Sequence, residues 1–122
     1  MSTSDDYILI VEDDDDIAET IGLILQTRGY RCAIARNGAE ALGRLQTDPL
    51  PRVVLLDMMM PGMSGSQFLE VQLQDPRIAG IPVVVMTGDP RAEARAAALG
   101  VAKFLRKPLG IPELIAAVGD PD

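Results

Sequence analysis

The segment Val53-Val54-Leu55-Leu56-Asp57 decides the fold class, because four aliphatic residues in a row end abruptly at a carboxylate. Such a run is too short for a helix, and its lack of polar alternation is typical of a strand that is buried on both faces of a sheet. Residues 7–11 and 82–86 have the same character. We therefore expect three buried strands, each with polar residues at its carboxyl end.

Amphipathic stretches lie between the expected strands. After the acidic run at 12–16, apolar residues recur at helical spacing as far as Leu25, and we expect Asp15 or Asp16 to cap that helix and Gly29 to end it. Asp89 and the proline after it likewise fit an N-cap followed by a first-turn proline. The other expected elements are strands within 31–36 and 101–105 and helices around 41–45, 68–73, 91–99 and 111–118.

The alternation of strand and helix, repeated five times, fills the chain. Alternating elements indicate parallel strands joined by right-handed crossovers, with helices on both faces of the sheet. A chain of 122 residues has the usual length of one domain. We therefore expect a single doubly wound (βα)5 domain over 1–122, with no room for an output domain.

The composition excludes several classes of function. With 18 acidic and 11 basic residues, the net charge of −7 disfavours direct contact with nucleic acid or an anionic membrane surface. There is no histidine and Cys32 is the one cysteine, which excludes His-based catalysis, a Cys/His zinc site and an internal disulfide. No apolar run approaches the roughly 18 residues of a membrane helix, and the acidic start is unlike a signal peptide. These features predict a cytoplasmic domain.

Five polar side chains follow the expected strands at their carboxyl ends. They are Glu12, Asp13, Asp57, Thr87 and Lys107. Because the carboxyl ends of parallel strands meet at one rim of the sheet, where ligands bind in such folds, we expect these side chains to converge.

The converging residue types suit phosphoryl transfer. Neighbouring carboxylates raise one another's pKa, and a hard cation such as Mg²⁺ relieves their repulsion while it retains water and a phosphoryl oxygen. Lys107 supplies a point charge for a phosphate and Thr87 supplies a hydroxyl donor. Asp57 is the natural nucleophile, since aspartyl phosphates form by carboxylate attack.

Four separated motifs resemble the response-regulator receiver domain of two-component signal transduction, in the family's order and spacing. They are Ile10-Val11-Glu12-Asp13-Asp14, Leu55-Leu56-Asp57-Met58-Met59-Met60-Pro61-Gly62-Met63-Ser64-Gly65, Val85-Met86-Thr87-Gly88 and Phe104-Leu105-Arg106-Lys107-Pro108. The resemblance covers residues 7–118. It implies the flavodoxin-like fold of a chemotaxis receiver, with strand order 2-1-3-4-5.

The resemblance implies a phosphoprotein that takes a phosphoryl group onto Asp57 from a histidine kinase or phosphotransfer protein. Asp13, Asp57 and the backbone carbonyl of Met59 would bind Mg²⁺, and Glu12 would act through a metal-bound water. The domain would catalyse only its own phosphorylation and dephosphorylation, so we do not expect an enzyme with an external substrate.

The resemblance also implies a switch. Thr87 and Lys107 would contact the phosphoryl group, the bond between Lys107 and Pro108 would be cis, and Phe104 would change rotamer on activation. The face built by the fourth helix, fifth strand and fifth helix would then signal to a downstream protein or to an output domain outside this chain.

Several positions depart from the commonest pattern of the family. Glu12 replaces the more frequent aspartate. Met59 and Asp89 flank the path of hydrolytic water and should tune the lifetime of the phosphate. Ala102-Lys103 replaces an acidic pair that is frequent in members that dimerise through their last helices, which weakens the case for that dimer.

Four basic residues fall on the expected output face: Arg91, Arg95, Lys103 and Arg106. A solvated surface would explain them, and so would a patch that meets an acidic partner. The second interpretation is our prediction.

Two other functional classes remain as alternatives. A haloacid-dehalogenase-type phosphohydrolase also uses a strand-end aspartate with Mg²⁺, but it needs a second acid where this chain has Met59. A degenerate receiver that serves only as an interaction module would not keep the full set of acids, Thr87 and Lys107. A nucleotide-binding fold lacks support because no Gly-rich phosphate loop is present.

Overall fold

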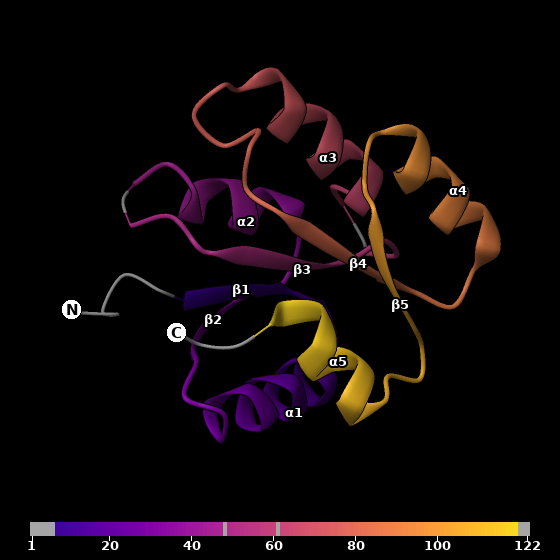
Figure 1. The fold of residues 1–122 in the computed structure, drawn as a ribbon. Coiled ribbons are helices and arrows are strands. Elements are labelled where there is room, and N and C mark those ends of the chain that lie inside the picture. The colour runs from indigo at the N-terminus through magenta and orange to yellow at the C-terminus, as the bar shows by residue number, and fades with distance from the viewer. Residues whose placement is uncertain (1–6, 48, 61, 120–122) are drawn as a thin grey trace.

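A parallel sheet with strand order β2-β1-β3-β4-β5 forms the centre of the molecule (Figure 1). The computed structural model describes residues 7–47, 49–60 and 62–119; both ends of the expected domain and Pro61 of the second motif lie outside the described residues. Over the described ranges the strands are β1 (Tyr7–Val11), β2 (Arg31–Ala35), β3 (Val53–Asp57), β4 (Val83–Thr87) and β5 (Lys103–Arg106).

Helices cover both faces of this sheet. They are α1 (Asp15–Gln26), α2 (Gly38–Arg44), α3 (Gly65–Gln74), α4 (Pro90–Ala98) and α5 (Ile111–Val118). In Figure 1, α1 and α5 lie together on one face, and α2, α3 and α4 lie on the other. The predicted doubly wound (βα)5 fold and its strand order are therefore confirmed.

The core consists of two apolar clusters separated by the sheet. Because successive side chains of a strand point to opposite faces, Ile10 packs in the cluster of α1 and α5, while its neighbour Val11 packs in the cluster of α2, α3 and α4. In β5, Leu105 and Phe104 divide in the same way. Every residue of β1 and β3 is buried, as the unbroken apolar runs predict.

The start of α1 differs from the prediction by one residue. Asp14, rather than Asp15 or Asp16, is the N-cap: its backbone is extended and its carboxylate accepts a hydrogen bond from the Ile17 amide at 3.1 Å. The Asp15 side chain instead pairs with Arg36 at 2.6 Å. The helix ends at Gln26, and Gly29 adopts a φ of +92° in the turn that follows.

Three strands end one residue later than predicted, since β3 includes Asp57 and β4 and β5 end at Thr87 and Arg106. Thr87 is the last residue of β4, not the first beyond it, because it still pairs with Arg106 in the ladder. β5 accordingly begins and ends later than the expected 101–105. The predicted cap of α4 is confirmed, since the Asp89 carboxylate accepts from the Arg91 amide at 2.9 Å and Pro90 occupies the first turn. Within the ranges that the structure describes, none of the helices combines the length and apolar character needed to cross a bilayer.

Candidate functional site

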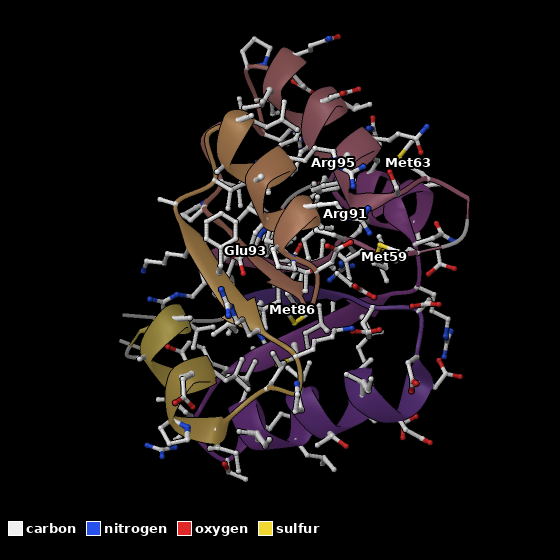
Figure 2. All side chains as sticks on the ribbon, turned by 90° about the vertical axis from the view of Figure 1, so that its right-hand side faces the viewer. Met59, Met63, Met86, Arg91, Glu93 and Arg95 are labelled. Carbon is white, nitrogen blue, oxygen red and sulfur yellow. The ribbon has the colours of Figure 1, made fainter. Side chains whose placement is uncertain are left out.

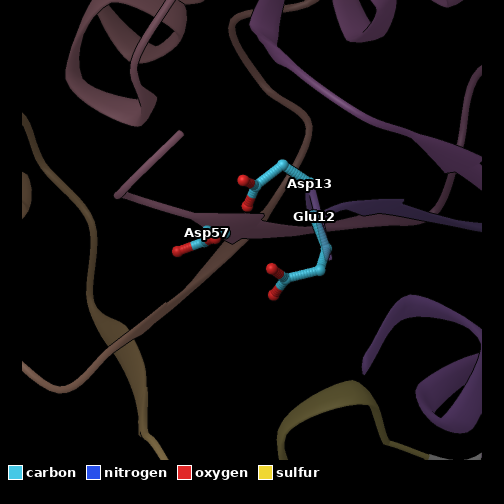
Figure 3. Close-up of side chains that lie close together, drawn as sticks. All are labelled: Glu12, Asp13 and Asp57. Carbon is cyan, nitrogen blue, oxygen red and sulfur yellow. The ribbon is translucent and has the colours of Figure 1, made fainter. Parts of the chain in front are cut away.

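Three carboxylates meet at the carboxyl ends of β1 and β3 (Figure 3). Val11 and Leu56 are partners in the parallel ladder, so the residues that follow them, Glu12 and Asp57, emerge side by side. Asp13 completes the group, and one carboxylate oxygen from each residue lies within 4.8 Å of the others. Glu12 and Asp57 are only 1% and 2% exposed, whereas Asp13 is open to solvent.

Lys107 supplies the positive charge that faces these carboxylates. Its ammonium nitrogen lies 3.0 Å from Glu12 Oε1 and 3.4 Å from Asp57 Oδ2. The Lys107 amide donates to the Thr87 carbonyl at 3.2 Å, and the bond to Pro108 is cis, as the resemblance implies. The end of β4 thus holds the start of the β5–α5 loop beside the acidic cluster.

The charges in this cluster do not balance. Burial, together with the charge of Asp57, raises the pKa of Glu12 from 4.5 to about 7, although the hydrogen bond from Lys107 opposes the shift. Burial lowers the pKa of Lys107, but its hydrogen bond to Glu12 and the charge of Asp57 outweigh burial, so the net shift is upward. One ammonium among three carboxylates leaves the site able to accept further positive charge.

The loop after β3 is held close to the phosphoacceptor candidate. The Met59 amide donates to Asp57 Oδ1 at 3.1 Å, while the Met59 side chain is 63% exposed. Further along the loop, a Cβ on Gly65 would lie 2.7 Å from the Met58 Cα, so only glycine allows α3 to begin this close to the strand. Ser64 caps α3: its hydroxyl accepts from the Gln67 amide, and its own amide donates to the Gln67 side-chain oxygen.

Thr87 and Phe104 lie where the sequence predicts, at the end of β4 and in β5. The Thr87 side chain is buried at the rim, and its hydroxyl accepts a hydrogen bond from the Asp89 amide at 3.1 Å. Phe104 is half-buried and packs against the cluster of α2, α3 and α4. The structure therefore brings the side chains of Lys107, Glu12 and Asp57 into direct contact. Thr87 is joined to Lys107 through its backbone carbonyl, and among the described residues neither the Thr87 hydroxyl nor Phe104 bonds to the three side chains.

The four predicted basic residues form a less positive surface than the sequence alone indicates. Figure 2 shows two of them, Arg91 and Arg95, on α4 together with Glu93. Arg106 pairs with Glu93 at 3.3 Å, and Arg91 pairs weakly with Asp89 at 3.5 Å. Lys103 donates to a carbonyl of α5 at 3.4 Å. Asp89 and Glu93 were not part of the predicted patch, because the pairing of Glu93 with Arg106 joins α4 to β5 and cannot be read from spacing along the chain.

An apolar groove beside Lys107 was missed by the sequence analysis. It has a volume of about 580 Å³ and lies between α1 and the β5–α5 loop; its walls include Ile17, Ile24, Leu109 and Ile111. Lys107 forms part of its rim, so the groove opens next to the carboxylates. The sequence feature that could have indicated the groove is the apolar stripe of α1, since Ile17 and Ile24 of that stripe line it.

Comparisons with known proteins agree on one family. The family model described as the response regulator receiver domain matches residues 8–119. The phosphate regulon transcriptional regulatory protein PhoB of Escherichia coli is 33% identical over 113 residues, which are 91% of this chain and 49% of that protein. The DNA-binding response regulator MtrA of Mycobacterium tuberculosis is 32% identical over 120 residues, 97% of this chain and 51% of that protein. The chain thus spans about half the length of these curated relatives.

Solved structures share the fold. The chemotaxis response regulator CheY4 of Vibrio cholerae superposes with a TM-score of 0.84 at 26% identity, over 92% of this chain and 94% of that one. The signal receiver domain of a histidine kinase from Syntrophus aciditrophicus gives a TM-score of 0.84 at 33% identity, over 94% of this chain and 87% of that one.

Proposed function

Because the chain belongs to the response regulator receiver domain family, we propose that it is a phosphoacceptor that takes a phosphoryl group onto Asp57 and passes a signal to a partner protein. One observation carries the proposal: Asp57 lies at the end of β3 within a cluster of Glu12, Asp13 and Lys107. The cluster contains a nucleophile, a set of hard oxygen ligands and a cation, which are the parts that phosphoryl transfer requires.

The residues present fit Mg²⁺. Three carboxylate oxygens within 4.8 Å of one another, two of them on buried side chains and opposed by one ammonium, form an oxygen-only ligand set. Hard oxygen ligands favour Mg²⁺ over softer metals. Asp13, Asp57 and the backbone carbonyl of Met59 would hold the ion, and Glu12 would act through a water. Bound there, the ion would neutralise charge that develops on the phosphoryl oxygens.

The chemistry belongs to Asp57. A carboxylate oxygen attacks the phosphorus of a phosphohistidine on the partner, the bond from phosphorus to the imidazole nitrogen breaks, and the imidazole leaves with that electron pair. Lys107, already 3.4 Å from Asp57, moves its charge to the new phosphoryl group. The Thr87 hydroxyl accepts from the Asp89 amide and so keeps its own proton for a phosphoryl oxygen.

The phosphoryl group then shifts a conformational equilibrium. Movement of Thr87 toward the phosphoryl group makes room that the half-buried Phe104 can fill. The face of α4, β5 and α5 changes shape and signals to a downstream protein or an output domain. A coupling of about 1–3 kcal/mol is typical of such switches.

The apolar groove supports a docking place for the phosphodonor. Its rim includes Lys107, so an amphipathic helix of a histidine kinase or phosphotransfer protein lying along α1 would bring its phosphohistidine to Asp57. Such partners use ATP-derived phosphate, which agrees with a cytoplasmic domain in a phosphorelay.

We propose that residues 1–122 form one receiver unit that does not itself bind nucleic acid or membrane, since its net charge is −7.

Intact-mass measurement after incubation with a small phosphodonor and Mg²⁺ tests the proposal. We expect one phosphoryl adduct on the wild-type chain, none on Asp57→Asn, and none when the metal is chelated. Asp75→Asn, at the far end of α3, is the matched control and should label normally. Labelling that persists in Asp57→Asn would contradict the assignment, and continuous hydrolysis of an external phosphate ester would favour the dehalogenase-type alternative.

A further inference from the structure

Methionines surround Asp57, and one of them differs from the rest. Met58, Met60 and Met86 are buried, with exposed fractions of 4%, 8% and 0%, and Met63 is partly buried against the core. Met59 is 63% exposed. Its side chain therefore contributes little to the core, although its backbone amide makes the hydrogen bond to Asp57.

Met59 lines a small hollow at the loop that follows Asp57. The hollow has a volume of about 230 Å³ and lies between the β3–α3 loop and α4; Ser64, Ala92 and Arg95 also line it. Figure 2 shows Met59 and Arg95 on the same face of the molecule, from the loop and from α4. The Met59 amide donates to Asp57 Oδ1 at 3.1 Å, so a change at this residue is one hydrogen bond away from the phosphoacceptor.

We propose that Met59 is a site of reversible oxidation by peroxides, and that its sulfoxide shortens the lifetime of the phosphoryl group on Asp57. The second half rests on the proposed function. In the oxidation, a sulfur lone pair attacks one peroxide oxygen, the O–O bond breaks, and the other oxygen takes up a proton and leaves as water or an alcohol. The sulfur loses two electrons and the peroxide gains them; a thiol-dependent sulfoxide reductase reverses the step.

Access makes the reaction selective. A peroxide reaches the exposed Met59 sulfur directly, whereas the buried methionines must wait for local opening. Cys32 does not compete at neutral pH, because burial raises the pKa of its thiol to about 11 and the thiolate is the reactive form.

The sulfoxide adds a strong hydrogen-bond acceptor to a hollow whose lining already includes Ser64 and Arg95. The thioether accepts hydrogen bonds weakly, while the sulfoxide oxygen accepts them strongly from water or from the Arg95 guanidinium, which is donor-only. Water held by the sulfoxide would stand on the loop whose Met59 amide bonds to Asp57, the residue that would carry the acyl phosphate. One ordinary hydrogen bond corresponds to a shortening of the phosphoryl half-life by about two- to tenfold.

The test treats the full chain with dilute hydrogen peroxide. Peptide fragmentation assigns the added oxygen among Met58, Met59 and Met60, and intact mass follows decay of the phosphoryl adduct after the donor is removed. We expect Met59 to be oxidised first, the half-life to fall by about two- to tenfold, and a sulfoxide reductase to restore it. Met59→Leu should remove the response to peroxide, while Met63→Leu and Cys32→Ala should retain it.

Two results would overturn the inference. One is equal oxidation of the buried and exposed methionines, and the other is an unchanged half-life on protein that is fully oxidised at Met59. Failure of the untreated protein to form any adduct would overturn the proposed function and the coupling together, while the peptide map would still decide whether Met59 is the oxidised residue.

Discussion

The ammonium of Lys107 lies 3.0 Å from the Glu12 carboxylate, although the two residues are 95 positions apart in the chain. The contact joins the end of β1 to the loop after β5, and Asp57 lies between the two at the end of β3. Because both carboxylates are buried, this single cation stabilises the site before any phosphoryl group or metal binds.

Glu12 should make the metal-free protein less stable as the pH rises. Its folded-state pKa of about 7 exceeds the ordinary 4.5, so the folded protein binds more protons than the unfolded chain across that window. The free energy of unfolding therefore falls from pH 4.5 to about 7. Urea unfolding in chelator should show this slope in the wild type and a flatter one in Glu12→Gln. An unchanged slope in that variant would rule out Glu12 as its source; Glu113→Gln, on an exposed helix end, is the control.

Removing Lys107 should destabilise the metal-free domain. Lys107→Met leaves Glu12 and Asp57 buried together without a cation, which should lower the free energy of unfolding by roughly 2–3 kcal/mol. The loss should be smaller at acidic pH, where Glu12 is protonated. Lys103→Met, which removes an exposed lysine, should change stability by less than about 0.5 kcal/mol. Equal effects of the two substitutions would contradict the role of the buried cluster.

Asp13 should govern metal affinity with little effect on folding. The side chain is exposed, so Asp13→Asn should change the free energy of unfolding in chelator by less than about 0.5 kcal/mol. Added Mg²⁺ should raise the melting temperature of the wild type through ligand linkage and raise that of Asp13→Asn much less. Asp16→Asn, also exposed and outside the cluster, should behave as the wild type does. Equal Mg²⁺ titrations of wild type and Asp13→Asn would refute the ligand role.

Gly65 and Gly43 should respond oppositely to alanine. At Gly65 the new Cβ would lie 2.7 Å from the Met58 Cα and 2.9 Å from the Asp57 carbonyl oxygen, so backbone must move at a cost of about 1–3 kcal/mol. At Gly43, in α2, nothing lies within 4 Å, and alanine should stabilise by about 0.5–1 kcal/mol. Chemical unfolding measures both, and slower labelling of Asp57 should accompany Gly65→Ala alone. Similar stability changes at the two positions would contradict the close approach.

The fold was predictable because local pattern and topology agree. The unbroken apolar runs of β1 and β3, the cap and proline that start α4, and the spacing of α5 each determine their own element. Alternating strands and helices make the strands parallel, so the sequence alone predicts that Glu12, Asp57 and Lys107 meet at one rim of the sheet. The strand order came from resemblance, since periodicity alone cannot order strands.

What the sequence could not predict depends on distances between side chains. Asp14 and Asp15 are equally good caps by residue type, but in the structure Asp14 has the extended backbone and caps the helix while Asp15 pairs with Arg36. The neutralisation of Arg106 by Glu93 depends on how β5 lies against α4. The groove beside α1 depends on where the β5–α5 loop lies.

The sheet that divides the core also separates the place where the phosphodonor would dock from the place where Phe104 would move. The groove next to Lys107 belongs to the side of α1 and α5, whereas Phe104 packs on the side of α2, α3 and α4. A rotamer change at Phe104 would act first on the side of α2, α3 and α4, and it would reach the groove through α5, whose first residue Ile111 lines it. The phosphodonor and the downstream partner would therefore use surfaces that meet only at α5, so a shift of this one helix would make the binding of either partner depend on the other.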